Sequence, residues 1–171
     1  WGLKGRFPAI LDHREYGAAA RDLYGHATRM LGTIVEDGSL CASGVYGFWP
    51  AGSDGDDLVL FEDRSQRTEV ARFPMLRQQE VIEEGRPHLS LADFVAPAGA
   101  GHRDYVGAFA VTAGLGADDL AARHASAHDD YHAIMAKALA DRLAEAFAEY
   151  LHARVRREWG YGEAERLSPE D

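Results

Sequence analysis

The spacing of hydrophobic residues predicts two helical regions in this chain. Residues 16–36 place apolar side chains at three- and four-residue intervals, the pattern of an amphipathic helix, and Gly38 is suited to end it. A second helical region is predicted for residues 118–159, with a break near Ala127. Its apolar stripe, expected to face the core, follows four-residue steps: Tyr131, Met135, Leu139, Leu143, Phe147, Leu151, Val155 and Trp159.

The segments between these helices predict β-strands. A hairpin is expected from two apolar segments on either side of the turn at residues 52–57, and Pro74 is expected to end a third strand. The four predicted strands are residues 40–51, 58–63, 67–75 and 105–114. Residues 76–85 predict a short helix or helical turn that stops at Gly85, and the glycine-rich residues 98–104 predict a flexible connection. Helix, antiparallel strands and helix in this order indicate the α+β class.

Composition and charge exclude several classes of protein. The chain has 171 residues, 46% of them hydrophobic, and a net charge of -10, which argues against a general nucleic-acid or anionic-membrane binder. No apolar run approaches the roughly 20 residues of a membrane span. The single cysteine, Cys41, excludes an internal disulfide and is interpreted as a buried structural thiol. A soluble cytoplasmic domain is expected.

Both ends of the sequence suggest a piece of a longer polypeptide. Residue 1 is tryptophan rather than methionine, and Ser168 and Pro169 form a helix-start pair with no helix after them. We therefore expect residues 1–171 to be a domain that is incomplete at its N- and C-terminal ends.

An acidic row in the long helix is the first candidate site. Lys137, Asp141, Glu145 and Glu149 recur at four-residue steps and form one face. One interpretation is a solvated face with a Lys137–Asp141 pair, worth a few tenths of a kcal/mol. The alternative is a partly covered carboxylate next to a cationic ligand. The second interpretation is favoured by small neighbours that would let another surface approach, namely Ala133, Ala136, Ala140, Ala144 and Ala148.

Two further clusters carry candidate chemistry. His124, His128 and His132 have the four-residue spacing that lets histidines on one helix share a metal ion, but no catalytic glutamate follows them, and no metal site is predicted. Asp129 and Asp130 are interpreted as first-turn acids that oppose the helix dipole. The basic cluster of Arg154, Arg156 and Arg157 suits either a helix C-terminus or an acidic partner.

Several segments together resemble one family. They are LKGRFPAIL, LRQQ, LADFVAP, DYVGAFAVTAG and HDDYHAIMAKALADRLAEAFAEYLHARVRREWGYG. In this order, from Trp1 to about Gly162, they resemble the activation domain of cobalamin-dependent methionine synthase. The resemblance implies a single α+β domain with a curved antiparallel sheet and flanking helices. It agrees with the class predicted from the hydrophobic pattern.

The resemblance also implies a function. In that family the activation domain binds S-adenosylmethionine and supports reductive methylation of inactive cob(II)alamin to methylcobalamin. This restores an enzyme that makes methionine from homocysteine and methyltetrahydrofolate. The implied partners are the cobalamin-binding domain of the same enzyme and, as electron donor, flavodoxin or a flavoprotein reductase. The protein mainly holds an electrophilic methyl group in line with a strong nucleophile, and no catalytic residue is assigned to this chain.

Two site residues follow from matching the family's pattern. Glu145 corresponds to an acidic residue near the sulfonium, and Asp141 lies on the face expected to meet the cobalamin domain. His128, Asp129, Asp130 and Tyr131 match a helix-start pattern. The family's main cofactor contacts, an Asp upstream of Trp1 and an Arg-x-x-x-Gly-Tyr-Pro stretch downstream, are expected outside this chain. Two alternatives stay open: a non-catalytic docking module for a cobalamin domain or flavodoxin, and a metal-binding protein built on the histidines.

Overall fold

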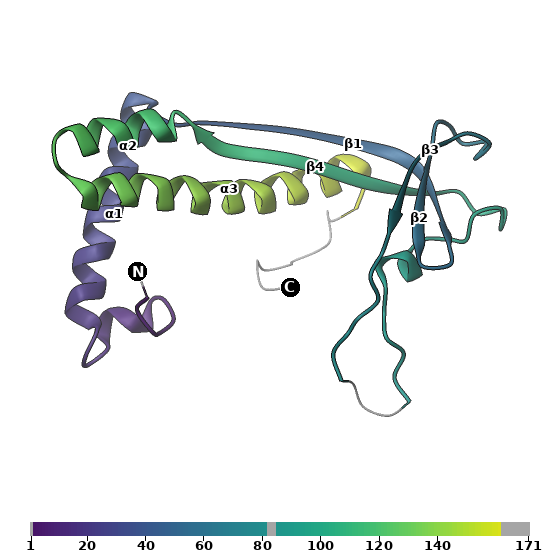
Figure 1. The fold of residues 1–171 in the computed structure, drawn as a ribbon, viewed down its shortest axis with the longest axis horizontal. Helices are drawn as coiled ribbons and strands as arrows, with labels where there is room; N and C mark the ends of the chain where they lie inside the picture. Colours follow the sequence, from purple (N-terminus) through teal and green to yellow (C-terminus); the bar gives the residue numbers. More distant parts are fainter. Residues whose placement is uncertain (1, 82–84, 162–171) are drawn as a thin grey trace. The chain divides into compact units, whose positions relative to one another are not determined.

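The computed structural model describes residues 2–81 and 85–161 and has the predicted α+β class (Figure 1). Its helices are η1 (Ala9–Asp12), α1 (Gly17–Asp37), η2 (Leu91–Phe94), α2 (Ala117–Ser126) and α3 (Asp130–Trp159). Its strands are β1 (Cys41–Asp54), β2 (Asp57–Phe61), β3 (Glu69–Pro74) and β4 (Asp104–Leu115). The strands form one antiparallel sheet in the order β3-β2-β1-β4.

The chain forms two compact units, which we name the helical unit and the sheet unit. The helical unit comprises residues 1–44 and 110–171, and the sheet unit comprises residues 45–109. Strands β1 and β4 each contribute residues to both. Among the described helices, none combines the length and the apolar character that crossing a lipid bilayer requires.

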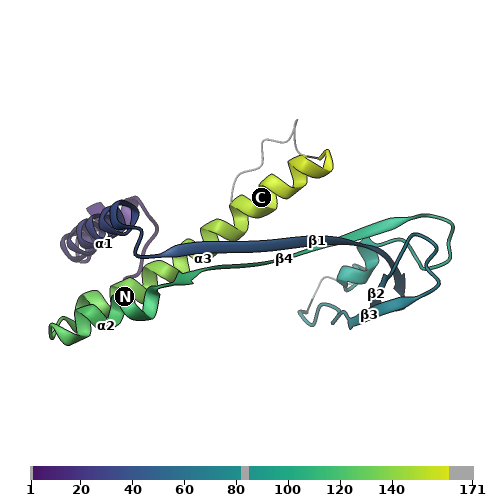
Figure 2. The same cartoon turned by 90° about the horizontal axis from the view of Figure 1, so that it is seen from above.

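The helical unit confirms both predicted helical regions. Helix α1 ends at Gly38, which adopts the left-handed conformation with φ 64° that favours glycine. The predicted break near Ala127 separates α2 from α3, and α2 packs along α3 (Figure 2). The core combines residues of all three helices: Met30, Ile34, Leu120, Met135 and Ala136 are buried, with Leu23, Ala27, Leu40 and Leu139 packed against them.

The apolar stripe of α3 is only partly buried. Met135, Leu151 and Val155 lie in the core as predicted. Tyr131 and Trp159, at the two ends of the stripe, are exposed, and Leu143 and Phe147 in its middle are half-buried. The prediction that the whole stripe faces the core is therefore wrong.

The sheet unit confirms the predicted hairpin. Strands β1 and β2 pair from Ala51–Leu60 to Asp54–Asp57, so β1 runs past its predicted end at Ala51 and the turn is shorter than expected. Gly55 occupies this turn with φ 61°. Strand β2 lies between β1 and β3, and four of its five residues are buried: Leu58, Val59, Leu60 and Phe61.

The helix predicted for residues 76–85 is wrong for its described part. Residues 76–81 form no helix, because long-range contacts hold them: the Gln78 N–H donates to the Leu89 carbonyl over 2.8 Å. Arg77 donates to the Asp93 carboxylate, at 2.7 Å and 2.9 Å, and pairs with Asp56. Residues 82–84 lie outside the described residues.

The interpretation of Cys41 as a buried thiol is also wrong. Cys41 is exposed, as are the next five residues of β1. It stands at the first position of the strand, before the segment that β2 covers.

Candidate functional site

Helix α3 presents Asp141 and Glu145 on an exposed face. Each is two residues from Leu143, and two residues correspond to about 200° around an α-helix. Both carboxylates therefore point away from the half-buried Leu143. The Arg142 guanidinium lies 2.7 Å from the Glu145 carboxylate, and their side chains are 69% and 60% exposed. A carboxylate with this exposure is accessible to a cationic ligand or to a docking surface.

The neighbours of the acidic row differ from expectation in two ways. Lys137 lies 3.3 Å from Asp118 of α2, so the expected Lys137–Asp141 pair is replaced by a pair between helices. Ala136 and Ala140 are buried inside the helical unit. These two small side chains therefore serve internal packing rather than the approach of another surface.

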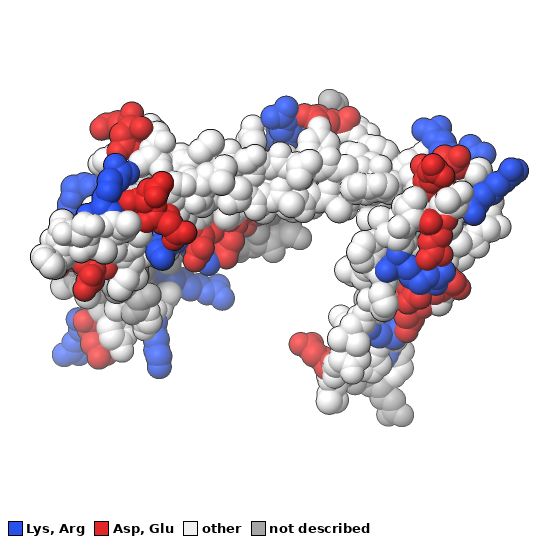
Figure 3. All heavy atoms as spheres, turned by 45° about the horizontal axis from the view of Figure 1, so that its top comes forward, with Lys and Arg blue, Asp and Glu red and all other residues white. Residues whose placement is uncertain are grey.

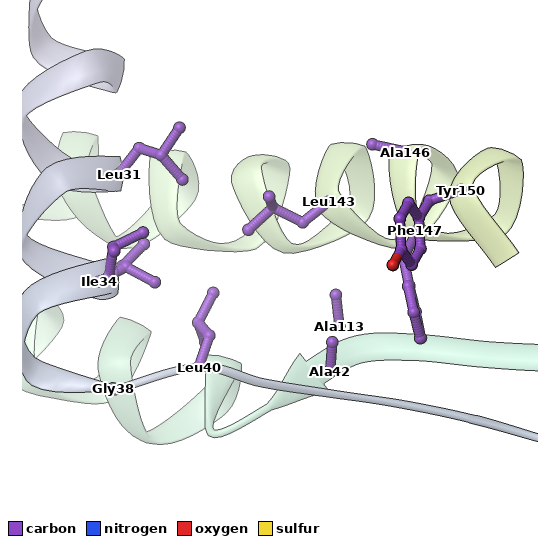
Figure 4. A pocket seen from close by; sticks show the side chains of 11 residues that line it. Leu31, Ile34, Gly38, Leu40, Ala42, Ala113, Leu143, Ala146, Phe147 and Tyr150 are labelled. Atoms are coloured by element: carbon purple, nitrogen blue, oxygen red, sulfur yellow. The ribbon is translucent and has the colours of Figure 1, made fainter. Parts of the chain in front are cut away.

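A cavity of about 440 Å³ lies on the other side of α3, within the helical unit. In Figure 4 Leu143 points from α3 toward Leu40, and Phe147 points toward β4 near Ala113. The lining residues are Leu31, Ile34, Val35, Gly38, Leu40, Ala42, Ala113, Leu143, Ala146, Phe147 and Tyr150. None of them is charged, so this cavity suits apolar groups, and the carboxylates of the acidic row lie outside it.

Charge is mixed rather than segregated on the face shown in Figure 3, where acidic and basic side chains lie next to one another. In the sheet unit, for example, Arg72 binds three carboxylates at 2.9–3.0 Å, those of Asp54, Asp57 and Glu69. At the end of α3, Arg154 pairs with Glu158 over 2.7 Å, and Arg156 lies 5.9 Å from the ring centroid of Tyr161. Part of the basic cluster thus has local acidic or aromatic partners.

The three histidines predicted on one helix are divided by the break. His124 lies on α2, His132 on α3, and His128 between them has a left-handed φ of 59°. The structure brings His124 and His132 to the same carboxylate, Asp129, and leaves His128 out of the group.

Asp129 lies at the start of α3 as predicted, but it is the N-cap residue, and only Asp130 lies in the first turn. The Asp129 side chain caps α3 by accepting a hydrogen bond from the His132 backbone N–H over 3.1 Å. This hydrogen bond, together with the His132 ring, holds the pKa of the Asp129 carboxyl below its usual value. Sequence reasoning missed that the cap also joins two histidines. The break near Ala127 was predicted, but the spacing of the aspartate, five residues after His124 and three before His132, does not show how the turn brings both histidines to it.

Comparison with known proteins decides the family. Residues 1–171, the entire sequence, match the family model described as vitamin B12 dependent methionine synthase, activation domain. The chain belongs to this family. A solved structure described as the crystal structure of the MetH reactivation domain bound to AdoHcy is 46% identical, with a TM-score of 0.90. The superposition covers 99% of this chain and 52% of that chain, so this activation domain sequence spans about half of the solved chain's length.

The activation-domain resemblance deduced from sequence is confirmed. The assignment of Glu145 and Asp141 to a ligand site stays a prediction.

Proposed function

We propose that this chain forms part of a cobalamin-dependent methionine synthase, where it contributes to binding S-adenosylmethionine and supports reductive methylation of cob(II)alamin. The observation that carries the proposal is the family match over all 171 residues, joined to a 46% identical structure that holds AdoHcy. AdoHcy is what remains of S-adenosylmethionine when its methyl group leaves. A domain that holds the product of methyl transfer is suited to holding the donor.

The chemistry proposed requires little of this chain beyond placement. One electron from flavodoxin or a flavoprotein reductase reduces cob(II)alamin, a substrate held by a neighbouring domain. The reduced cobalt then forms a bond to the methyl carbon as the carbon–sulfur bond breaks, and AdoHcy leaves with that electron pair. Alignment of two reactants can supply a large part of such a rate enhancement. This is consistent with the absence of any assigned catalytic residue.

The acidic face of α3 supports a position near the sulfonium cation. Glu145 and Asp141 are exposed carboxylates one helical turn apart, on the side of α3 away from its core. A carboxylate favours an adjacent positive charge, and the interaction strengthens where a second domain excludes water. We therefore propose that Glu145 lies near the sulfonium and that Asp141 faces the cobalamin domain.

Equilibrium binding to the complete polypeptide that contains this chain tests the proposal. S-adenosylmethionine should bind with one site per chain, and AdoHcy should displace it. Deleting residues 1–171 should abolish both. If S-adenosylmethionine binds equally after the deletion, the donor site lies elsewhere. If neither S-adenosylmethionine nor AdoHcy binds the intact polypeptide while the cobalamin domain still associates with the chain, the chain is a docking module.

A further inference from the structure

Histidine rings from all three α-helices of the helical unit stack on one another. The His132 ring of α3 lies 5.5 Å from that of His26 on α1, nearly parallel at 7°. It also lies 5.6 Å from the His124 ring of α2, at 29°. The proposed methyl transfer uses none of these imidazoles.

One carboxylate serves two of these rings. Asp129 Oδ2 lies 2.7 Å from His132 Nδ1 and 3.7 Å from His124 Nδ1. The three side chains are between 30% and 38% exposed, so they are neither fully solvated nor sealed. One ligand atom from each of the three residues falls within 4.8 Å of the other two. Two imidazole nitrogens and a carboxylate oxygen form a donor set typical of zinc sites.

The backbone of the helix break fixes this arrangement. The His124 carbonyl accepts hydrogen bonds from the N–H groups of Ala127 and Asp129, both at 3.0 Å. The Asp129 carboxylate is held in turn by its hydrogen bond to the N–H of His132. Ligands that are already oriented by hydrogen bonds lose little conformational freedom when an ion binds.

A third ring nitrogen in the same stack belongs to His26 and makes no hydrogen bond within the described part of the chain. His26 Nδ1 is buried and has no hydrogen-bond partner among the described residues. Buried polar atoms are nearly always partnered, and an exception calls for an ion, a water molecule or a functional explanation. The unpartnered nitrogen marks this stack as a polar site.

We propose that His124, Asp129 and His132 bind a divalent transition metal ion of the zinc class at the junction of α2 and α3. In a tetrahedral site, ligand atoms at about 2.0–2.2 Å from the metal lie roughly 3.3 Å from one another. The present spacings reach that value by side-chain shifts of about 1 Å or less for the two pairs that share Asp129. His132 offers Nδ1 in the tautomer that carries its proton on Nε2. Water completes the coordination.

The ion would link α2 to α3, because His124 lies on α2, Asp129 caps α3 and His132 lies on α3. It would stabilise the helix break from which α3 starts, because an ion that binds only the folded chain raises the free energy of unfolding. The role proposed is structural and independent of S-adenosylmethionine binding.

Titration of the metal-free chain with Zn²⁺, followed by calorimetry and by the thermal unfolding midpoint, tests the site. One ion should bind per chain and raise the midpoint, and Co²⁺ should give visible absorption bands of nitrogen coordination. His124→Ala should weaken Zn²⁺ binding at least about tenfold and abolish the increase in midpoint. Asp129→Asn should do the same while keeping a good N-cap residue, which separates lost coordination from a lost cap.

His128→Asn is the matched control. It removes a histidine from the same turn and keeps a residue that tolerates the left-handed conformation, and it should bind Zn²⁺ as the parent chain does. Circular dichroism checks that each variant is folded. Absence of saturable binding to the parent chain overturns the proposal. The proposal is also overturned if His128→Asn weakens Zn²⁺ binding as much as His124→Ala does. The same holds if Asp129→Asn and His124→Ala each bind Zn²⁺ as tightly as the parent chain.

Discussion

Gly44 of β1 lies directly against the aromatic ring of Phe147 on α3. A Cβ added to Gly44 would lie 3.0 Å from Phe147 Cε1 and 3.2 Å from Leu151 Cδ2. Within the helical unit, a residue without a side chain thus lets α3 approach the start of β1. This approach turns Phe147 inward and leaves Glu145, two residues earlier, on the far side of the helix.

Gly44→Ala should therefore destabilise the chain by about 1–3 kcal/mol, since a methyl group forced into a close contact costs energy of this order. Chemical denaturation measures the change. Combined with Phe147→Leu, the two substitutions should cost less than the sum of their separate effects. Gly32→Ala is the control: nothing lies within 4 Å of its added Cβ in α1, and it should stabilise by up to about 1 kcal/mol. If Gly44→Ala leaves the free energy of unfolding unchanged, α3 does not contact β1 closely at Gly44.

Met135 should be the most costly position of α3 to truncate. Its side chain is 1% exposed in the core cluster, so Met135→Ala should lower the free energy of unfolding by about 2–5 kcal/mol. Ile134, the preceding residue, is 61% exposed, and Ile134→Ala should cost about 0.5 kcal/mol or less. Equal losses in urea denaturation would show that α3 is rotated from its described orientation.

Asp93 should make the stability of the chain depend on pH in the acidic range. The Arg77 guanidinium, followed by the N–H of Ser90, holds the pKa of Asp93 below its usual value. A carboxyl with a lowered folded-state pKa contributes stability above its unfolded pKa near 4, and that contribution is lost as the pH falls through the folded value. The thermal midpoint of Asp93→Asn should lie below that of the parent chain from pH 5 to 8.

The gap between these two midpoints should narrow as the pH falls below about 4. The difference in thermal midpoint between Arg77→Gln and the parent chain should narrow in the same pH range, because Arg77 is the largest cause of the lowered pKa of Asp93. A gap that stays constant down to pH 2 would show that the Asp93 carboxylate is not held by Arg77.

Glu145→Gln tests the proposed place of the acidic row. In the complete polypeptide it should slow remethylation of cob(II)alamin, or weaken S-adenosylmethionine binding, by about ten- to a hundredfold, the scale of one charge-assisted contact. Folding should change little, because the side chain is 60% exposed. Turnover with methyltetrahydrofolate and homocysteine should be spared.

Glu158→Gln provides the matched control for Glu145→Gln. Each glutamate lies on α3 with an arginine of the same helix at 2.7 Å, Arg154 for Glu158 and Arg142 for Glu145. Only the Glu145 variant should affect remethylation. Equal rates for both variants and the parent would assign Glu145 to a solvated face with no role in the reaction.

Local patterns in the sequence predicted most of the fold. The periodic apolar residues of α1, the glycine that ends it and the break near Ala127 depend on neighbours in the chain, so the sequence carries them directly. The irregular segment around Arg77 does not: its conformation depends on Asp56 and Asp93, which are distant in sequence. The half-burial of Phe147 likewise depends on Gly44 in another element.

The candidate site was less predictable than the fold. Two carboxylates one helical turn apart could be read from the sequence, but solvated and ligand-facing rows share that pattern. The grouping of His124 with Asp129 and His132 depended on the conformation of the turn between α2 and α3. The break near Ala127 was predicted, but the four-residue spacing of the histidines was interpreted as for a single helix. Only the family resemblance favours a methyl-donor site over an ordinary polar face, and this assignment of Glu145 and Asp141 stays a prediction.

Transfer of a labelled methyl group tests whether this chain supports the reductive methylation of cob(II)alamin by S-adenosylmethionine. The complete polypeptide, prepared with cob(II)alamin, is given S-adenosylmethionine labelled in its methyl group and a one-electron donor, and label in methylcobalamin is measured in a single turnover. The proposed function predicts that the intact polypeptide transfers the label. A polypeptide without residues 1–171 should not transfer it, although that polypeptide should still turn over when supplied with methylcobalamin. Equal transfer of label with and without this chain would contradict the proposed function.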